Sequence, residues 1–161
     1  MAVSPDAFRA ALRKFATGVT VVTVASGEEL HGMTASAFAS VSLSPPLVLV
    51  CLDKSSRTLS LVEEAGSFAI NVLRSDQQET SQAFSRPGLK PFASTSHRRG
   101  DNGAPVLDDA IAVLECSTYS VFEAGDHEVV LGEVTATAVP GGDPLVYFDG
   151  AYRSLHSTSE S

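Results

Sequence analysis

The segment His31–Thr58, HGMTASAFASVSLSPPLVLVCLDKSSRT, decides how the rest of this chain is interpreted. It starts with small residues, continues through a serine-rich strand and a Pro-Pro break, and reaches the apolar run Leu47–Leu52. It ends in a polar loop, Asp53–Thr58, that leads into a helix. The first N–H groups of a helix lack internal partners, and the helix dipole favours negative charge there. We therefore predict a phosphate site at this helix start, with charge from Lys54 and Arg57 and hydroxyls from Ser55, Ser56 and Thr58.

The composition is that of one folded domain, which we expect to span residues 1–156 with a frayed tail at 157–161. A net charge of −8 argues against nucleic acid and anionic membrane surfaces as partners. No apolar stretch approaches the roughly 18 residues of a membrane span, and the N-terminus does not resemble a signal peptide. Cys51 and Cys116 lie in apolar runs without metal-ligand spacing, which predicts two reduced, buried thiols in a cytoplasmic protein.

The pattern along the chain predicts three helices and several strands. Ser4 and Pro5 begin an amphipathic helix that Gly18 ends, a second helix runs over 56–65, and a capping box at Ser75–Gln78 begins a third. Strands are expected at Thr20–Val24, from His31, at Leu47–Leu52 (covered on both faces), Ser67–Leu73, Ile111–Phe122, His127–Val139, Leu145–Phe148 and Gly150–Leu155. Strands in hairpin spacing favour a mainly β fold, a closed antiparallel barrel with a few flanking helices, over a βαβ sheet. The irregular segment 85–105 is either a functional lid or a mobile loop.

Several kinds of active site are missing from the sequence. There is no GxGxxG, no P-loop, no GxSxG and no HExxH motif, and the four histidines are scattered. A barrel with a phosphate site and a wall of small residues suits a cofactor that carries its own chemistry.

These residues resemble the flavin reductase-like domain family, whose fold is the FMN-binding split barrel, a split antiparallel β-barrel. The resemblance covers nearly the whole chain and rests on five pieces in order: FATGVTVVT (15–23), the segment 31–58, FAINVL (68–73), GDHEVVLGEV (125–134) and YFDGAYRSL (147–155).

The resemblance implies an enzyme: a homodimer with flavin near the subunit interface that passes hydride from NADH or NADPH to FAD or FMN. The reduced flavin then serves a separate flavin-dependent monooxygenase or halogenase. The ring edge is expected against Thr34, Ala35, Ser36 and Ala37, and the phosphate against Cys51, Leu52, Asp53, Lys54, Ser55, Ser56, Arg57 and Thr58. His127 is expected beside the nicotinamide as the catalytic residue, with Tyr152 and Arg153 near the pyridine nucleotide and Phe92 against the cofactor.

Two departures from the family pattern affect these expectations. Ser36 stands where the family often has Asn, and it offers one donor rather than two. The closing segment Asp149–Arg153 is less basic than is usual in the family. Weaker positive charge there would bind the 2′-phosphate of NADPH less well, which favours NADH as the hydride donor.

Other interpretations stay open. The structural alternatives assign these residues no ligand. His127 would be an exposed residue at the start of a strand, and Lys54 and Arg57 would be solvated at the start of a helix. Asn71 would be a core residue that hydrogen-bonds to the backbone. The functional alternatives are a non-catalytic flavin-binding protein, a flavoenzyme of related fold acting on a small organic substrate, and a β-barrel interaction module without cofactor.

Overall fold

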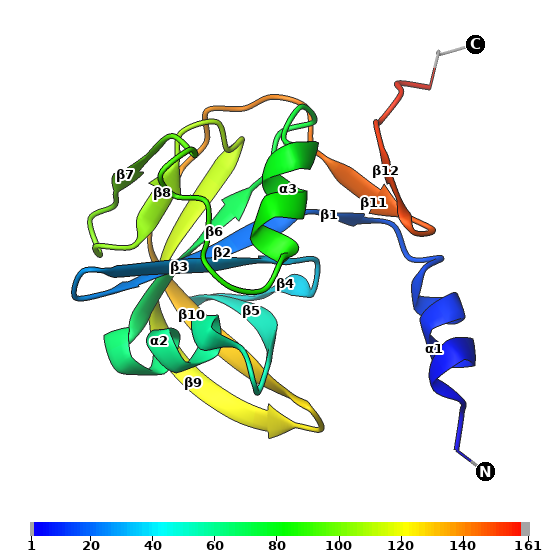
Figure 1. The fold of residues 1–161 in the computed structure, drawn as a ribbon, viewed down its shortest axis with the longest axis horizontal. Coiled ribbons are helices and arrows are strands. Elements are labelled where there is room, and N and C mark those ends of the chain that lie inside the picture. Colours follow the sequence, from blue (N-terminus) through cyan, green and yellow to red (C-terminus); the bar gives the residue numbers. More distant parts are fainter. Residues whose placement is uncertain (1, 159–161) are drawn as a thin grey trace.

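The main body of the protein is one seven-stranded antiparallel sheet with the strand order β3-β2-β6-β9-β10-β5-β4 (Figure 1). A computed structural model describes residues 2–158. The sheet contains β2 (Thr20–Ser26), β3 (Glu29–Ala35), β4 (Phe38–Leu43), β5 (Pro46–Asp53), β6 (Ser67–Val72), β9 (Ala112–Ala124) and β10 (His127–Ala138). Two small sheets pair β1 (Thr17–Gly18), β11 (Val146–Phe148) and β12 (Ala151–Arg153), and β7 (His97–Arg99) with β8 (Pro105–Leu107).

The helices of the described chain are α1 (Pro5–Leu12), α2 (Arg57–Ala65) and α3 (Gln78–Ser85). The prediction of a mainly β, antiparallel fold with a few helices is therefore confirmed. No helix within residues 2–158 is long and apolar enough to cross a membrane. Residues 159–161 of the predicted tail lie outside the described residues.

The two edge strands of the large sheet, β3 and β4, are consecutive in the chain and are joined by Ser36 and Ala37. Because so short a link spans roughly 10 Å, the sheet has to curl until its edges approach each other. Within residues 2–158 no ladder joins β3 to β4, so the expected closed barrel is corrected to a curled sheet split between these strands. The link turns sharply, with the Phe38 N–H donating to the Ser36 carbonyl at 2.9 Å, and this directs β4 onto β5.

The core has two parts that meet at β2. One part contains Val22 and Val24 with Val50, Leu61 and Phe68. The other lies near α3 and β8 and contains Val21, Leu73, Phe84, Val106 and Leu107. Successive side chains of a strand point to opposite faces, so β2 is buried on both faces and holds the two parts together.

The central polar residue Asn71 is buried and fully hydrogen-bonded. Its Nδ2 donates to the Val21 carbonyl at 3.0 Å and to Thr23 Oγ1 at 3.0 Å, and its Oδ1 accepts from the Leu107 N–H at 2.9 Å. The structural interpretation of Asn71 is confirmed.

Three local predictions were wrong. The strand β5 is not covered on both faces: Val48, Val50 and Leu52 are buried, whereas Leu49 and Cys51 on the other face are partly exposed. The helix α1 ends at Leu12, before Gly18, and buries none of its residues. Ser75 does not cap α3, because the residue at the N-cap position of that helix is Gln77. The Gln77 side chain does not cap the helix either, since its Oε1 accepts a hydrogen bond from the Arg74 N–H.

We expect the variant Gly132→Ala to lower the free energy of unfolding by about 1–3 kcal/mol, the usual cost of overpacking a core. Gly132 lies where the β9–β10 ladder shifts register, and a Cβ there would lie 2.6 Å from Phe68 Cζ and 2.9 Å from Cys116 Cβ. Urea unfolding measures the change. Gly18→Ala is the matched control, since a Cβ at Gly18 meets nothing within 4 Å. Equal effects of the two variants would contradict the prediction.

Candidate functional site

Three neighbouring hollows at the split of the sheet share lining residues, and together we call them the track. The first, the basic pocket, measures about 590 Å³ and lies between the end of β5, the start of α2 and residues 85–90. The second, the bridging pocket, measures about 200 Å³ and shares Thr34 and Ser85 with the basic pocket. The third, the apolar cleft, measures about 460 Å³ and shares Ser36 and Tyr147 with the bridging pocket. A long ligand with a charged end and a flat apolar end fits such a track.

The loop before α2 supplies the polar end of the track. Ser56 caps the helix, its Oγ accepting from the Leu59 N–H at 3.1 Å. Asp53 Oδ1 accepts from the Ser55 N–H at 2.7 Å and from Ser55 Oγ at 2.5 Å, and these hydrogen bonds lower the pKa of the Asp53 carboxyl. The loop is therefore held in shape by its own side chains, with the N-terminal end of α2 facing the basic pocket.

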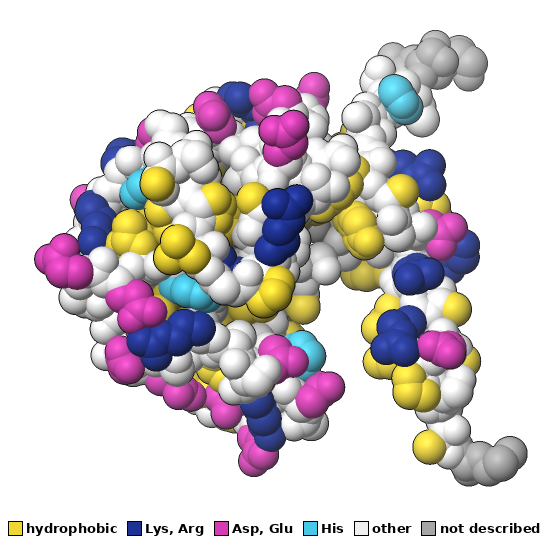
Figure 2. Space-filling model, in the orientation of Figure 1, with side chains coloured by type: hydrophobic (Ala, Val, Ile, Leu, Met, Phe, Trp, Pro, Cys, Tyr) yellow, Lys and Arg dark blue, Asp and Glu magenta, His cyan; other side chains and the backbone are white. Residues whose placement is uncertain are grey.

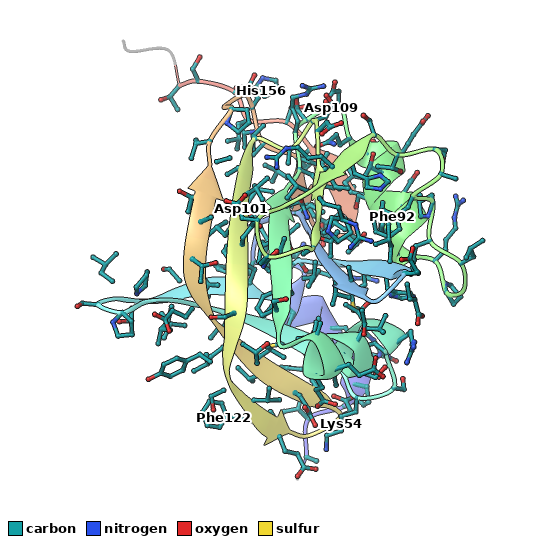
Figure 3. The ribbon with its side chains drawn as sticks, turned by 90° about the vertical axis from the view of Figure 1, so that its left-hand side faces the viewer. Lys54, Phe92, Asp101, Asp109, Phe122 and His156 are labelled. Carbon is teal, nitrogen blue, oxygen red and sulfur yellow. The ribbon has the colours of Figure 1, made fainter. Side chains whose placement is uncertain are left out.

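The two predicted cations of this loop separate in the structure. Arg57 lines the basic pocket and forms a double hydrogen bond with Glu29 at the start of β3. Lys54 lines none of the three hollows and pairs with Glu123 at the end of β9. In Figure 3, Lys54 lies at the end of the molecule that also carries Phe122.

His31, on β3, lines the basic pocket and contacts the fully buried Thr58, with 2.8 Å between His31 Nδ1 and Thr58 Oγ1. Burial and the charge of Lys90 lower the pKa of His31, and Glu29 opposes this shift. Thr58 thus acts on the pocket through His31 rather than by direct exposure.

The sequence analysis missed the opposite wall of the basic pocket. Arg86 and Lys90 lie there, after α3, and Lys90 Nζ donates to the carbonyl oxygens of Phe84 and Arg86 at 3.1 and 2.6 Å. Two cations within SRPGLKPF (85–92) were the available signal, but no motif connects them to β5 over so long a distance in sequence.

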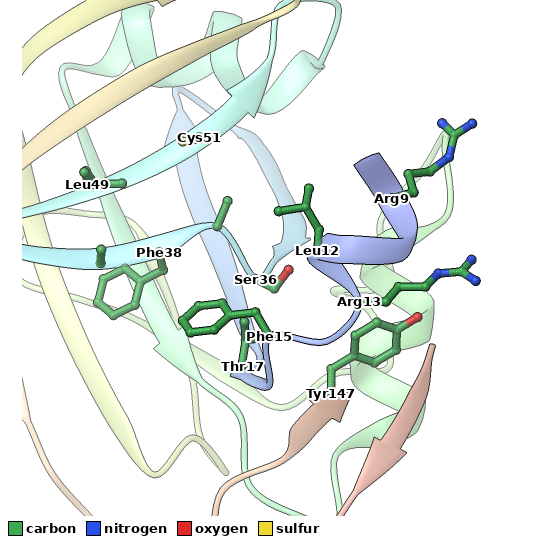
Figure 4. Close-up of a pocket in the computed structure, with 12 residues that line it drawn as sticks. Arg9, Leu12, Arg13, Phe15, Thr17, Ser36, Phe38, Leu49, Cys51 and Tyr147 are labelled. Carbon is green, nitrogen blue, oxygen red and sulfur yellow. The ribbon is translucent and has the colours of Figure 1, made fainter. Parts of the chain in front are cut away.

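Three of the four small residues at positions 34–37, which form the end of β3 and the link after it, line the hollows; Ala35 does not. Thr34 donates to the Ser81 carbonyl at 2.6 Å, and the buried Ala35 accepts from Thr20 Oγ1 at 2.6 Å. Ser36 lines both the bridging pocket and the apolar cleft, and Ala37 lines the cleft. Figure 4 shows Ser36 between Phe15, Leu12 and Tyr147.

The apolar cleft lies between α1 and the outer face of β4 and β5. Leu12 and Phe15 form one wall, and Phe38, Leu49 and Cys51 form the other (Figure 4). Cys51 is half-buried and Cys116 is buried, and neither forms a disulfide. Burial raises the pKa of the Cys116 thiol to about 12, which keeps it protonated.

Four other predicted residues do not line the track. Leu52 is fully buried in the core. Phe92 packs edge-on against Phe84 and His97, with ring centroids 5.2 Å apart in each pair. The Arg153 guanidinium lies over the Phe148 ring at 5.7 Å. His127 faces Asp53 across the β10–β5 ladder, and its Nδ1 lies 2.7 Å from Asp126 Oδ1.

Tyr152 does line the bridging pocket. Its hydroxyl lies 2.8 Å from Ser81 Oγ, and its ring meets Tyr147 edge-on at 5.4 Å. Among residues 2–158 no cluster of His, Cys, Asp or Glu is arranged to hold a metal ion.

The fold and the track define a class: a β-sheet protein that binds a flat ligand carrying phosphate. The chain belongs to the flavin reductase-like domain family, whose model matches residues 12–156. A flavin fits the residues present, because Arg57 and the α2 start suit its phosphate, and the short side chains of Thr34, Ser36 and Ala37 line the hollows in which its ring would lie.

Two relatives illustrate the match. A Rhizobium meliloti protein named "Probable flavin reductase" is 48% identical over 150 residues, which are 92% of this chain and 48% of the relative. The chain therefore spans about half the length of that relative. "FMN reductase (NADH) SmoA" of Agrobacterium fabrum is 45% identical over 145 residues, which are 90% of this chain and 83% of the relative.

Solved structures agree with these relatives. The NADH:FAD oxidoreductase SgcE6 of Streptomyces globisporus, in complex with NAD and FAD fragments, has a TM-score of 0.92 and 35% identity over 99% of both chains. BorF, the flavin reductase component of a bacterial two-component tryptophan halogenase, has a TM-score of 0.89 and 36% identity over 96% of this chain and all of BorF (100%).

We expect His31 to make folding stability depend on pH. Its pKa lies below the ordinary value of 6.5, so the unfolded chain binds more protons just below that pH, and stability falls as the pH falls through this window. The free energy of unfolding of the native protein minus that of His31→Gln should therefore decrease from about pH 7.5 to about pH 5. Urea unfolding at several pH values measures this difference. A difference that stays flat or grows on acidification would contradict the prediction.

Proposed function

We propose that the protein is an NADH-dependent flavin reductase that supplies reduced flavin to a separate oxygenase or halogenase. The observation that carries the proposal is that the basic pocket, the bridging pocket and the apolar cleft are neighbours, sharing the lining residues Thr34, Ser85, Ser36 and Tyr147. NADH and a proton convert oxidised flavin to reduced flavin and NAD⁺, and the flavin supplies this hydride-accepting chemistry when bound.

The chain's own residues bind and orient. Arg57 and Ser55, with the N-terminal end of α2, hold the phosphate in the basic pocket, and Ser56 contributes by capping that helix end. Backbone groups at Thr34–Ala37 and the Ser36 hydroxyl face the ring edge, where fixed donors stabilise the negative charge that develops on reduction. Tyr147 and Tyr152 bound the space next to the ring. The weakly basic closing segment supports NADH over NADPH.

We also propose that the protein acts as a homodimer in the cytoplasm. Large apolar side chains are exposed on and just after α1, on β4 and on β9: Phe8, Leu12, Phe15, Leu43, Tyr119 and Phe122. Figure 2 shows α1 standing apart from the body with hydrophobic side chains on its surface. Because exposed apolar area of this kind is a common mark of an interface, a second copy is the occupant we expect. His127 lines none of the hollows of this chain, so its contact with nicotinamide requires the partner subunit.

Anaerobic mixing with excess FMN or FAD and NADH tests the activity. We expect the visible absorbance of flavin to bleach over many turnovers per protein, and more slowly with NADPH. Tight flavin binding without bleaching would instead make the protein a non-catalytic flavin binder, and no binding at all would contradict the site.

A pair of variants tests the phosphate site within that assay. Arg57→Ala should raise the Michaelis constant for FMN about tenfold or more, the size expected for losing a hydrogen bond to a charged group. Lys54→Ala should change it little, because Lys54 faces Glu123 outside the basic pocket. Riboflavin, which lacks phosphate, should respond to neither variant.

The dimer is tested by Phe8→Asp, which places a charge on the exposed apolar face of α1. Phe8 is 57% exposed and lines none of the hollows. Burying an unpaired carboxylate in an interface is costly, so sedimentation should show a shift toward monomer. Leu89→Asp is the control, since Leu89 is fully exposed on the loop after α3. An unchanged Phe8→Asp oligomer would rule out this face.

A further inference from the structure

The arginine that the proposed phosphate site depends on is already occupied by a carboxylate of the same chain. Arg57 Nε donates to Glu29 Oε1 at 3.0 Å, and Nη2 donates to Glu29 Oε2 at 2.6 Å. Its third nitrogen, Nη1, donates to Ser60 Oγ at 3.1 Å. The Nε/Nη2 edge that binds Glu29 is one of the guanidinium edges that can bind a phosphate with two parallel hydrogen bonds, so Glu29 occupies a position that a phosphate could take.

Glu29 competes with the phosphate in charge as well as in geometry. Its hydrogen bonds to Arg57 lower the pKa of its carboxyl, so at neutral pH Glu29 is ionised, as the flavin phosphate is. The pair is about half exposed, with 47% of the Arg57 and 45% of the Glu29 side chain accessible to solvent. The two parallel hydrogen bonds make this pair stronger than a single exposed contact, but both ions remain partly hydrated, so a phosphate can displace Glu29 at a modest cost.

We propose that Glu29 is an affinity-setting residue: it competes with the flavin phosphate for Arg57, and this competition keeps flavin exchangeable. The inference rests on the proposed function, since a reductase that serves a separate enzyme has to release its flavin. When flavin leaves, Glu29 returns to Arg57, so the arginine is not left without a partner. Glu29 touches no reacting atom and acts through Arg57 alone.

The hairpin turn supplies a matched control for Glu29. Glu28 is its neighbour in the sequence, is also exposed, and forms no ion pair within the described residues. Glu28→Gln therefore makes the same change in net charge at the neighbouring position of the chain without freeing Arg57.

The test is the dissociation constant of FMN and of riboflavin, measured by quenching of flavin fluorescence with the full-length chain. Glu29→Gln should tighten FMN binding about two- to fivefold, the range expected from removing an exposed ion-pair competitor. Riboflavin affinity should not change, and Glu28→Gln should leave both constants as they are. In the double variant Glu29→Gln/Arg57→Ala the gain should disappear, because the two residues act on the phosphate as one unit.

Each other outcome would overturn the inference. Weaker FMN binding by Glu29→Gln would mean that Glu29 orients Arg57 for the phosphate. Unchanged binding, or equal tightening by Glu28→Gln, would mean that the pair does not compete with the phosphate. These failures are distinct from failure of the proposed function, which shows as absence of flavin bleaching by NADH in the native protein.

Discussion

The short link between β3 and β4 is the constraint on which the rest of the structure depends. The two edges of a seven-stranded sheet are joined by Ser36 and Ala37, so the sheet has to curl. Two backbone hydrogen bonds hold the link in place. The Phe38 N–H donates to the Ser36 carbonyl at the turn, and the Cys51 N–H of β5 donates to the Ala37 carbonyl. The edges therefore approach without forming a ladder, and the small side chains of the link leave space there. The binding track follows from that split.

The chemistry of the track comes from segments that are distant in sequence. β3 contributes His31 and Thr34, the loop after β5 contributes Ser55 and Arg57, and the segment after α3 contributes Lys90. In a chain with a net charge of −8 these cations are held locally, by a carboxylate at Arg57 and by backbone carbonyls at Lys90. A positive pocket on an acidic protein is stable when each cation has such a partner, and partners at the surface can exchange for a ligand.

The apolar face of β5 and the detached α1 have a common explanation. Leu49 and Cys51 alternate with the buried Val48 and Val50, so an apolar strand faces a cleft on one side. The helix α1 is amphipathic yet buries none of its residues in its own chain. The sequence predicted that Leu47–Leu52 is covered on both faces and that the first helix is amphipathic, yet in the described part of a single chain nothing covers the apolar face of either. A second copy would complete them, which links the oligomeric state to the same region as the ligand.

The sequence by itself determined much of the local structure, although not the end of α1 or the cap of α3. Alternation and β-branched runs located the strands, Ser56 and Gly66 marked the ends of α2, and the small residues at 34–37 marked the ring-edge segment, because these signals act over a few residues. Tertiary structure alone decided which cations face the ligand. Lys54 and Arg57 are only three positions apart in the sequence. Lys54 nevertheless pairs with Glu123 outside the basic pocket, whereas Arg57 pairs with Glu29 and lines the pocket. Arg86 and Lys90 line that pocket because α3, which precedes them, packs against β3. The two elements are about 50 residues apart in the sequence, so no local pattern predicts their contact.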